Sequence, residues 1–188
     1  MSEASFSIQF VPVAPILRFI GLLNAAVWLG SMVLFTAIVG PGIFSPEVKA
    51  LVGRSDWLPG AIAQILVVNY MVLQQWCAGI ALVHLIFDWL YTGKFAAKSS
   101  FFILLICLGL SFAGTQLLAP QMKQLHMMKY SPQSTQAQRE YAARNFGILH
   151  ATSQIANLLV FCGVLFYYWR LSVGPQGGRS GAGARYRS

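Results

Sequence analysis

Several polar side chains interrupt a mostly apolar stretch of this chain. The stretch NFGILHATSQIANLLVF, Asn145–Phe161, carries His150, Ser153, Gln154 and Asn157. An imidazole and two carboxamides can bind a ligand, coordinate a metal or join helices through hydrogen bonds. In a helix, positions 150, 153 and 157 share one face because they follow an i, i+3, i+7 spacing, and position 154 lies alongside. What this stripe can do depends on the elements that surround it.

The composition of the whole chain is that of a membrane protein. Of its 188 residues, 56% are hydrophobic and only 10% are charged, which is too few charges to cover a soluble domain of this size. Four apolar runs reach the roughly 20 residues that a helical span requires; they cover about 16–39, 64–91, 99–119 and 146–168. The runs do not alternate as barrel strands do. We therefore predict an all-α fold, an integral membrane four-helix bundle.

The segments between and beyond these runs set the predicted domain limits. We predict an N-terminal tail over 1–15, a four-helix transmembrane domain over 16–170 and a disordered basic C-terminal tail over 171–188. Ser131 is followed by Pro132, a pattern typical of a helix N-cap and first helical position. The last helix is therefore expected to extend toward 131 and to project out of the bilayer.

The positive charge of the chain indicates topology and lipid contact. The net charge of +8 comes from loops and tails, where basic residues face the cytoplasm and attract anionic lipid. Because the short loop around Lys94 and the acid-free tail fall on one side, we place both termini in the cytoplasm. The expected partners are the lipid bilayer, other membrane subunits and, at the basic C-terminal tail, anionic lipid or a partner protein. We expect no nucleic acid partner.

The first apolar run carries a stripe that matches the one on the last run. Asn24, Trp28, Ser31 and Phe35 share one helix face, and Asn24 is expected at the depth of Asn157. We predict a hydrogen bond between these two asparagines. Two interpretations of the paired stripes stay open. They join helices, at about 0.6–2 kcal/mol for each hydrogen bond, or they form a functional polar pocket.

Other contacts are expected where the helices approach closely. His150 is predicted to meet Ser111 and Thr115, which lie one turn apart on the third run. The small residues of the steps Ala26–Gly30 and Gly109–Ala113 would allow close helix packing, within the bundle or with a neighbouring protein.

The second apolar run carries a histidine and a carboxylate one turn apart. Asp88 follows His84 at i+4, which is a spacing that can fix the tautomer of an imidazole in a metal site or a proton relay. Both residues come near the end of the run, beside Trp89, Tyr91 and Lys94. We therefore favour an interfacial pair that reaches toward the headgroups.

The segment QMKQLHMMKY offers soft metal ligands. Met122, His126 and Met127, with His150, combine thioethers and imidazoles, the donors that suit Cu(I); methionines at a membrane boundary also serve as adaptable packing. His84 is expected roughly 20 Å or more from His150 along the helix axes, so these two cannot hold one haem. We expect no cofactor, with haem or copper at His126 and His150 as the alternative.

No catalytic motif is present. The chain has no GxSxG elbow, no Walker phosphate loop, no HExxH and no Rossmann glycine pattern. We predict a non-enzymatic polytopic membrane protein that acts as an accessory or structural subunit of a membrane complex. The alternatives are a haem- or copper-binding protein and a conduit for small molecules or ions.

Three segments carry a resemblance to a known family. RNFGILHATSQIANLL, Arg144–Leu159, resembles the signature of the last helix in the transmembrane protein 205-like family, the domain of unknown function 4149. NAAVWLGSMVLFTAIVGPGIF, Asn24–Phe44, is similar to the first helix of that family, and Leu118–Pro120 resembles the exit of its third helix. The resemblance implies a four-helix membrane bundle and supplies no agreed activity.

A more distant likeness is to copper-resistance (CopD-like) proteins and HemJ-type protoporphyrinogen oxidases. They share the Trp-x-Gly-then-Pro pattern, which here runs from Trp28 to Pro41. Haem-binding relatives carry a histidine upstream of that tryptophan. Residues 21–27 contain none, and this departure argues against haem.

Overall fold

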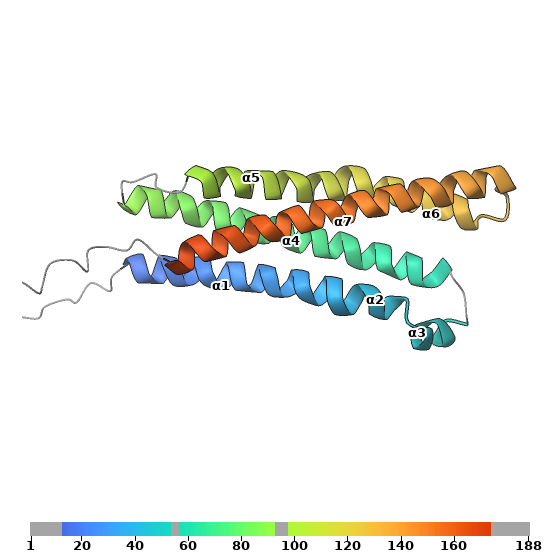
Figure 1. The fold of residues 1–188 in the computed structure, drawn as a ribbon, viewed down its shortest axis with the longest axis horizontal. Coiled ribbons are helices and arrows are strands. Elements are labelled where there is room, and N and C mark those ends of the chain that lie inside the picture. The colour runs from blue at the N-terminus through green and yellow to red at the C-terminus, as the bar shows by residue number, and fades with distance from the viewer. Residues whose placement is uncertain (1–12, 54–56, 93–97, 174–188) are drawn as a thin grey trace, which may run out of the picture.

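The described part of the chain is built from helices. The computed structural model describes residues 13–53, 57–92 and 98–173, and no strand occurs within these ranges (Figure 1). The helical elements are α1 (Val13–Leu34), η1 (Phe35–Val39), α2 (Gly40–Ile43), α3 (Pro46–Leu51), α4 (Trp57–Thr92), α5 (Lys98–Ala113), η2 (Gly114–Leu118), α6 (Ala119–Tyr130) and α7 (Gln136–Val173). The predicted all-α class is confirmed for these residues.

The elements join into long helical units that run up, down, up and down (Figure 1). Among the described residues, four units are long and apolar enough to cross a membrane: Pro15–Ile43, Trp57–Tyr91, Lys98–Tyr130 and Gln136–Val173. Each is longer than the apolar run that predicted it. One end of the arrangement holds the start of α1, the end of α4, the start of α5 and the end of α7. The other end holds α3 and the turn between α6 and α7.

The predicted tails fall mostly outside the described residues. Helix α1 already begins at Val13 and α7 continues to Val173, so both helices run into segments that were predicted as tails. Residues 1–12 and 174–188, and most of the predicted loop around Lys94, lie beyond the ranges that the structure describes.

Two prolines shape the first and third units. Pro41 and Pro120 lie just after the π-helical turns η1 and η2. A proline within a helix lacks an N–H and collides with the carbonyl one turn earlier, and a wider π turn relieves this conflict. The N–H of Gly40 accordingly bonds to the carbonyl of Phe35, five residues back. The sequence predicted that these helices end near the prolines, but the structure continues both helices through them.

The start of α7 corrects a prediction. Ser131 ends α6, as its N–H bonds to the carbonyl of Met127 at 2.9 Å. Helix α7 begins at Gln136 and is capped by Thr135, whose Oγ1 accepts from the N–H of Gln138 at 3.3 Å while the Gln138 carboxamide accepts from the N–H of Thr135 at 2.9 Å. Such a reciprocal pair satisfies two orphan donors of the first turn. This capping box therefore sets the boundary, and Ser131–Pro132 forms part of the turn.

The core lies where α1, α4, α5 and α7 meet. Its largest fully buried side chains include Trp28, Tyr167 and Met32. The glycines that pack most closely are not those of the predicted small-residue steps. A methyl group on Gly30 or Gly109 would meet nothing within 4 Å, so these two glycines make no close contact within the bundle.

Close helix contacts instead use other glycines. A methyl group on Gly21 would lie 2.7 Å from the ring of His84, and one on Gly163 would lie 2.8 Å from the sulfur of Cys107. These glycines let α1 approach α4, and α7 approach α5, because they have no side chain at the crossing point.

Candidate functional site

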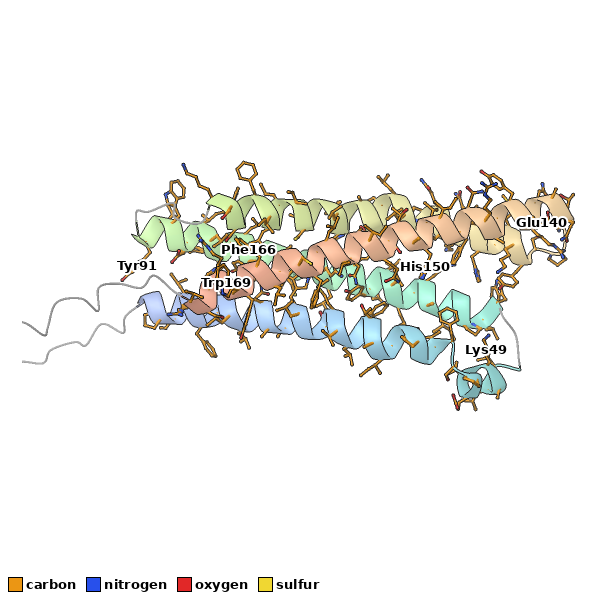
Figure 2. The ribbon with its side chains drawn as sticks, viewed as in Figure 1. Lys49, Tyr91, Glu140, His150, Phe166 and Trp169 are labelled. Carbon is orange, nitrogen blue, oxygen red and sulfur yellow. The ribbon has the colours of Figure 1, made fainter. Side chains whose placement is uncertain are left out.

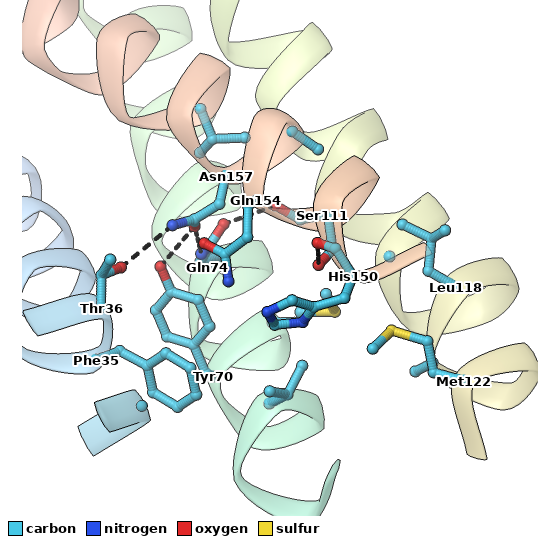
Figure 3. Close-up of a pocket in the computed structure, with 18 of the residues that line it drawn as sticks. Phe35, Thr36, Tyr70, Gln74, Ser111, Leu118, Met122, His150, Gln154 and Asn157 are labelled. Carbon is cyan, nitrogen blue, oxygen red and sulfur yellow. Dashed lines mark hydrogen bonds between the residues drawn. The ribbon is translucent and has the colours of Figure 1, made fainter. Parts of the chain in front are cut away.

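Asn157 is the centre of a hydrogen-bond network that joins η1, α4, α5 and α7. Its Oδ1 accepts from the hydroxyl of Tyr70 at 2.8 Å and from the Gln74 carboxamide at 3.2 Å, while its Nδ2 donates to Oγ1 of Thr36 at 3.3 Å (Figure 3). Gln74 in turn accepts from the hydroxyl of Ser111 at 3.2 Å. Thr36 comes from η1, Tyr70 and Gln74 from α4, and Ser111 from α5. The inward direction expected for Asn157 is therefore realised through partners on three helical units.

The predicted bond between Asn24 and Asn157 is absent. Asn24 donates from Nδ2 to the backbone carbonyl of Cys77 at 2.9 Å. The residue of the first helical unit that bonds to Asn157 is Thr36 instead of Asn24. Asn24 and Thr36 are separated by roughly 18 Å along the helix at 1.5 Å per residue. Ser31 donates to the carbonyl of Trp28 on its own helix at 2.7 Å. Neither Asn24 nor Ser31 reaches the Asn157 network, because the two helices are shifted along their axes relative to the expected register.

Sequence reasoning missed the residues of α4 in this network. Tyr70 and Gln74 lie at i, i+4, so they share one face of the second apolar run. Next to them, Gln75 donates to Oγ1 of Thr115 at 2.8 Å and to the carbonyl of Ser111 at 3.2 Å. Two adjacent glutamines in the middle of an apolar run were a signal of inward polar contacts.

A cavity of about 390 Å³ lies beside the network. Its polar lining residues are Thr36, Tyr70, Gln74, Ser111, His150, Ser153, Gln154 and Asn157. The rest of the wall is apolar and includes Phe35, Met71 and Met122. No aspartate, glutamate, lysine or arginine is among the described residues that line it. The cavity is therefore an uncharged site with hydrogen-bonding groups along one side.

Both π turns border this cavity. Gly40 and Pro41 follow η1 in the wall, and Gly114, Leu118 and Ala119 come from η2 and the start of α6. A π turn displaces the helix from its ideal path, and such turns are frequent at functional sites. The prolines that force the turns thus help to shape the space into which α7 projects its polar face.

His150 and Gln154 project from α7 into the cavity (Figure 3). Within the described residues, neither the imidazole of His150 nor the carboxamide of Gln154 makes a hydrogen bond, although the His150 ring is stacked on Phe146 at a centroid distance of 6.3 Å. Ser153 donates to the backbone carbonyl of His150 at 2.7 Å. His150 and Ser111 line the same cavity, but Ser111 donates to Gln74, and Thr115 is not among the lining residues and accepts from Gln75.

The predicted metal ligands are only partly brought together. Met122 and His150 both line the cavity, but His126 does not. Nε2 of His126 lies 3.2 Å from the carbonyl of Trp57, and its ring is buried against Gly60 and the neighbouring aromatic rings. Met127 is 50% exposed. The described residues contain no group of three or more histidine, cysteine, aspartate or glutamate side chains that could hold a metal ion.

His84 lies in the core, which corrects its assignment to an interfacial pair with Asp88. His84 is 5% exposed, and its Nδ1 lies 3.0 Å from the hydroxyl of Tyr167, which is fully buried. Only Asp88 of this pair stays partly accessible. Because Gly21 has no side chain, the imidazole of His84 fits between α1 and α4 and is buried there.

The position of His84 bears out one expectation about haem. Because His84 contacts Tyr167, it lies near the level of that residue on α7, and His150 precedes Tyr167 by 17 residues. This corresponds to roughly 25 Å along the helix axis. His84 and His150 are therefore too far apart to be axial ligands of one haem.

Comparison with known proteins identifies the family. The family model named "Domain of unknown function (DUF4149)" matches residues 23–131, which include the first-helix segment and the Leu118–Pro120 segment that suggested it. The Arg144–Leu159 segment lies outside the match. Comparison with curated proteins and with solved structures found no match. Because the matched region covers more than half of the 188 residues, the chain belongs to the DUF4149 family, a domain of unknown function.

Proposed function

We propose that this chain is a non-enzymatic, multi-pass membrane protein whose helices enclose a binding site for a small molecule. The observation that carries the binding role is a cavity of about 390 Å³ into which His150 and Gln154 project without hydrogen-bond partners among the described residues. Polar groups in a membrane span are expensive unless they are paired or serve a function. A cavity of this size falls in the range that accommodates small ligands.

A membrane-spanning arrangement is supported by the surface of the helices. Four units are long and apolar enough to span, and large hydrophobic side chains such as Leu158 and Ile155 are about 60% exposed. Lys49 and Glu140 lie at one end of the molecule, Tyr91 and Trp169 lie near the other, and His150 lies between (Figure 2). Charged ends and aromatic residues near a boundary are typical of proteins that cross a bilayer. We keep the proposal that both termini face the cytoplasm.

In the proposed arrangement, the binding site lies within the hydrocarbon. Asn157 lies at the middle of the last apolar run, and His150 lies about 10 Å from it toward α6, at 1.5 Å per residue. The cavity would then extend from the centre of the bilayer toward the leaflet that faces α3 and α6. A ligand in this position is most easily supplied by the membrane itself.

The test is a variant that fills the cavity. Ala119 lines the cavity and Ala151 does not, so Ala119→Phe should occupy the space while Ala151→Phe adds the same ring on the exposed side of α7. We expect the chain purified in mild detergent to carry a small molecule in stoichiometric amount by native mass spectrometry. Ala119→Phe should lose it and Ala151→Phe should keep it. Equal retention by the two variants, or no bound molecule in any of the three proteins, would refute the role.

Membership of a larger complex is the second part of the proposal. Most of each candidate span lies on the outside of the bundle, which leaves area for lipid and for other membrane subunits. An accessory or structural subunit would use this outer surface, and the basic residues beyond Val173 would contact anionic lipid or a partner. Purification in mild detergent followed by mass measurement would reveal a stable partner.

A metal or haem role is the alternative, and one observation favours copper. Met122 and His150 line the same cavity, and thioether and imidazole are ligands that Cu(I) accepts. The absorption spectrum and the metal content of the purified protein decide between these proposals. Stoichiometric copper that is lost in Met122→Leu, or a Soret band, would replace the small-molecule role.

Within the family, we propose a relationship to the transmembrane protein 205-like branch. The signature from Arg144 to Leu159 supports it, because this segment contains His150 and Asn157, which line the cavity. The more distant relationship to CopD-like and HemJ-type proteins is supported only by the pattern from Trp28 to Pro41. The absence of a histidine from residues 21–27 separates this chain from the haem-binding members.

A further inference from the structure

The polar side chains around the cavity form two groups that differ in their hydrogen bonding. The first group surrounds Asn157 and is satisfied, since Tyr70, Gln74 and Thr36 bond to it. The second group consists of His150 and Gln154, which make no side-chain hydrogen bond within the described ranges. The first group explains how α7 is held against α4 and η1. The donor and acceptor groups of the second group are therefore available to a bound molecule.

We infer that the cavity binds a neutral, lipid-soluble molecule through a flat, carbonyl-bearing head group that accepts hydrogen bonds from His150 and Gln154. This inference rests on the proposed function and specifies its ligand. Three features of the cavity support it: the absence of charged side chains among its described lining residues, the flat aromatic surfaces in it and its position beside the exposed side of α7.

The wall favours an uncharged ligand. No lysine or arginine is present among the described lining residues to neutralise an anion, and no aspartate or glutamate is present to neutralise a cation. A charge without a partner in a low-dielectric site is strongly disfavoured. The Gln154 carboxamide offers two N–H donors and a neutral imidazole offers one, so a carbonyl oxygen is a complementary acceptor.

Aromatic rings in the wall favour a flat head group. Phe35 and Tyr70 both line the cavity and stack on each other, with centroids 4.2 Å apart and planes 5° from parallel. The His150 ring presents a second flat surface across the cavity (Figure 3). Planar rings gain energy from offset stacking on aromatic side chains. Thioethers, here Met71 and Met122, also make favourable contacts with ring edges.

The exposure of α7 favours entry from the lipid. Although they project into the cavity, His150 and Gln154 are both exposed, so the space is not sealed on their side. In a chain that spans the bilayer, this side faces acyl chains. A molecule dissolved in the membrane could therefore enter laterally and leave an apolar tail among the lipids.

The experiment measures binding of a defined probe to the full chain in lipid nanodiscs. The probe is 2,3-dimethyl-1,4-naphthoquinone, which is flat, neutral and blocked against addition of thiols such as the exposed Cys162. We expect saturable binding of one probe per chain. Loss of a hydrogen bond in Gln154→Leu or in His150→Phe should weaken binding roughly tenfold. The His150→Phe variant keeps a flat ring, so its effect isolates the hydrogen bond from the stacking.

The control variant is Thr152→Val. Thr152 is exposed on the same helix, bonds only to the carbonyl of Ile148 in the described structure and does not line the cavity. Its affinity for the probe should equal that of the native chain. If the native chain and the three variants bind the probe with equal affinity, the signal reports partition of the probe into lipid, and the inference is overturned. Tighter binding of the decanoate anion than of the naphthoquinone would overturn it as well. If one cavity variant does not fold, the other one decides the result.

Failure of this inference can be separated from failure of the proposed function. If the naphthoquinone does not bind but a co-purified molecule is still lost in Ala119→Phe, the cavity is a ligand site and the inferred head group is wrong. If Ala119→Phe retains as much co-purified molecule as Ala151→Phe, the binding role itself is wrong.

Discussion

The carboxamide oxygen of Asn157 on α7 accepts a hydrogen bond from the hydroxyl of Tyr70 on α4, at 2.8 Å. The Tyr70 ring is at the same time stacked on Phe35 of η1. One side chain of α4 therefore connects the helical units that begin and end the described chain. This contact also sets the boundary of the cavity, because all three residues line it.

Asn157→Leu should destabilise the bundle by about 1–2 kcal/mol, because it orphans the Tyr70 hydroxyl and the amide of Gln74 inside the span. Thermal unfolding in detergent measures this change. The control is Thr152→Val, which removes only a bond to the carbonyl of Ile148 on the same helix. An Asn157→Leu protein that is as stable as Thr152→Val would show that the network does not hold the helices together.

His150→Gln should leave the stability of the chain nearly unchanged. The imidazole has no hydrogen-bond partner among the described residues, so its loss orphans no group there. The stacking of His150 on Phe146, with centroids 6.3 Å apart, contributes about 0.5–1.5 kcal/mol at most. The same unfolding experiment compares this variant with Asn157→Leu. A larger loss of stability in His150→Gln than in Asn157→Leu would mean that His150 is structural.

Gly21→Ala should destabilise the contact between α1 and α4, by about 1–3 kcal/mol as for other overpacked sites. The added methyl group would lie 2.7 Å from the His84 ring, which is buried and held by Tyr167. The control is Gly79→Ala, because a methyl group there meets nothing within 4 Å and alanine favours a helix. The idea fails if the two alanine variants unfold at the same temperature.

Arg18→Gln should loosen the end of α7. The Arg18 guanidinium donates to the backbone carbonyls of Leu171 at 3.0 Å and Ser172 at 2.6 Å, in the last described turn of α7. Basic side chains can donate to the carbonyls of a last helical turn in place of backbone N–H groups. Because these groups are exposed, global stability should change by less than about 1 kcal/mol. Hydrogen exchange should instead become faster at amides of the last turn, near Arg170, and stay unchanged near Val160.

Cysteine labelling tests the topology. Tyr91 and Val173 lie at one end of the helical units and Ser134 lies at the other. In a background with Cys162→Ala, an impermeant thiol reagent should label Tyr91→Cys and Val173→Cys from the same compartment, and Ser134→Cys from the opposite one. Labelling of all three from one compartment would contradict a four-span arrangement.

Much of the fold follows from the sequence because hydrocarbon imposes strict conditions on a chain. A backbone in lipid must satisfy its own polar groups, so apolar runs of about 20 residues become helices. The same condition directs Asn157 toward the interior, since its carboxamide has no partner in lipid. The helix class, the four long units and the inward position of this residue were therefore accessible from residue type and spacing.

The limits of the elements were harder to predict. A proline usually ends a helix, so Pro41 and Pro120 were interpreted as exits, whereas π turns before them carry both helices on. At the start of α7, Ser131 and Thr135 are both plausible caps. The choice falls on Thr135 because Gln138 reciprocates its hydrogen bond.

By itself, the sequence determined that Asn157 and His150 share a polar face within an apolar helix. Only the tertiary structure decided that Asn157 meets Tyr70 and Gln74 rather than Asn24, and that His150 faces a cavity. The physical reason is that partner choice depends on how far each helix slides along its neighbours. Packing at points such as Gly21 against His84 sets that shift. The spacing of residues along one helix gives no information about how far that helix is shifted relative to its neighbour.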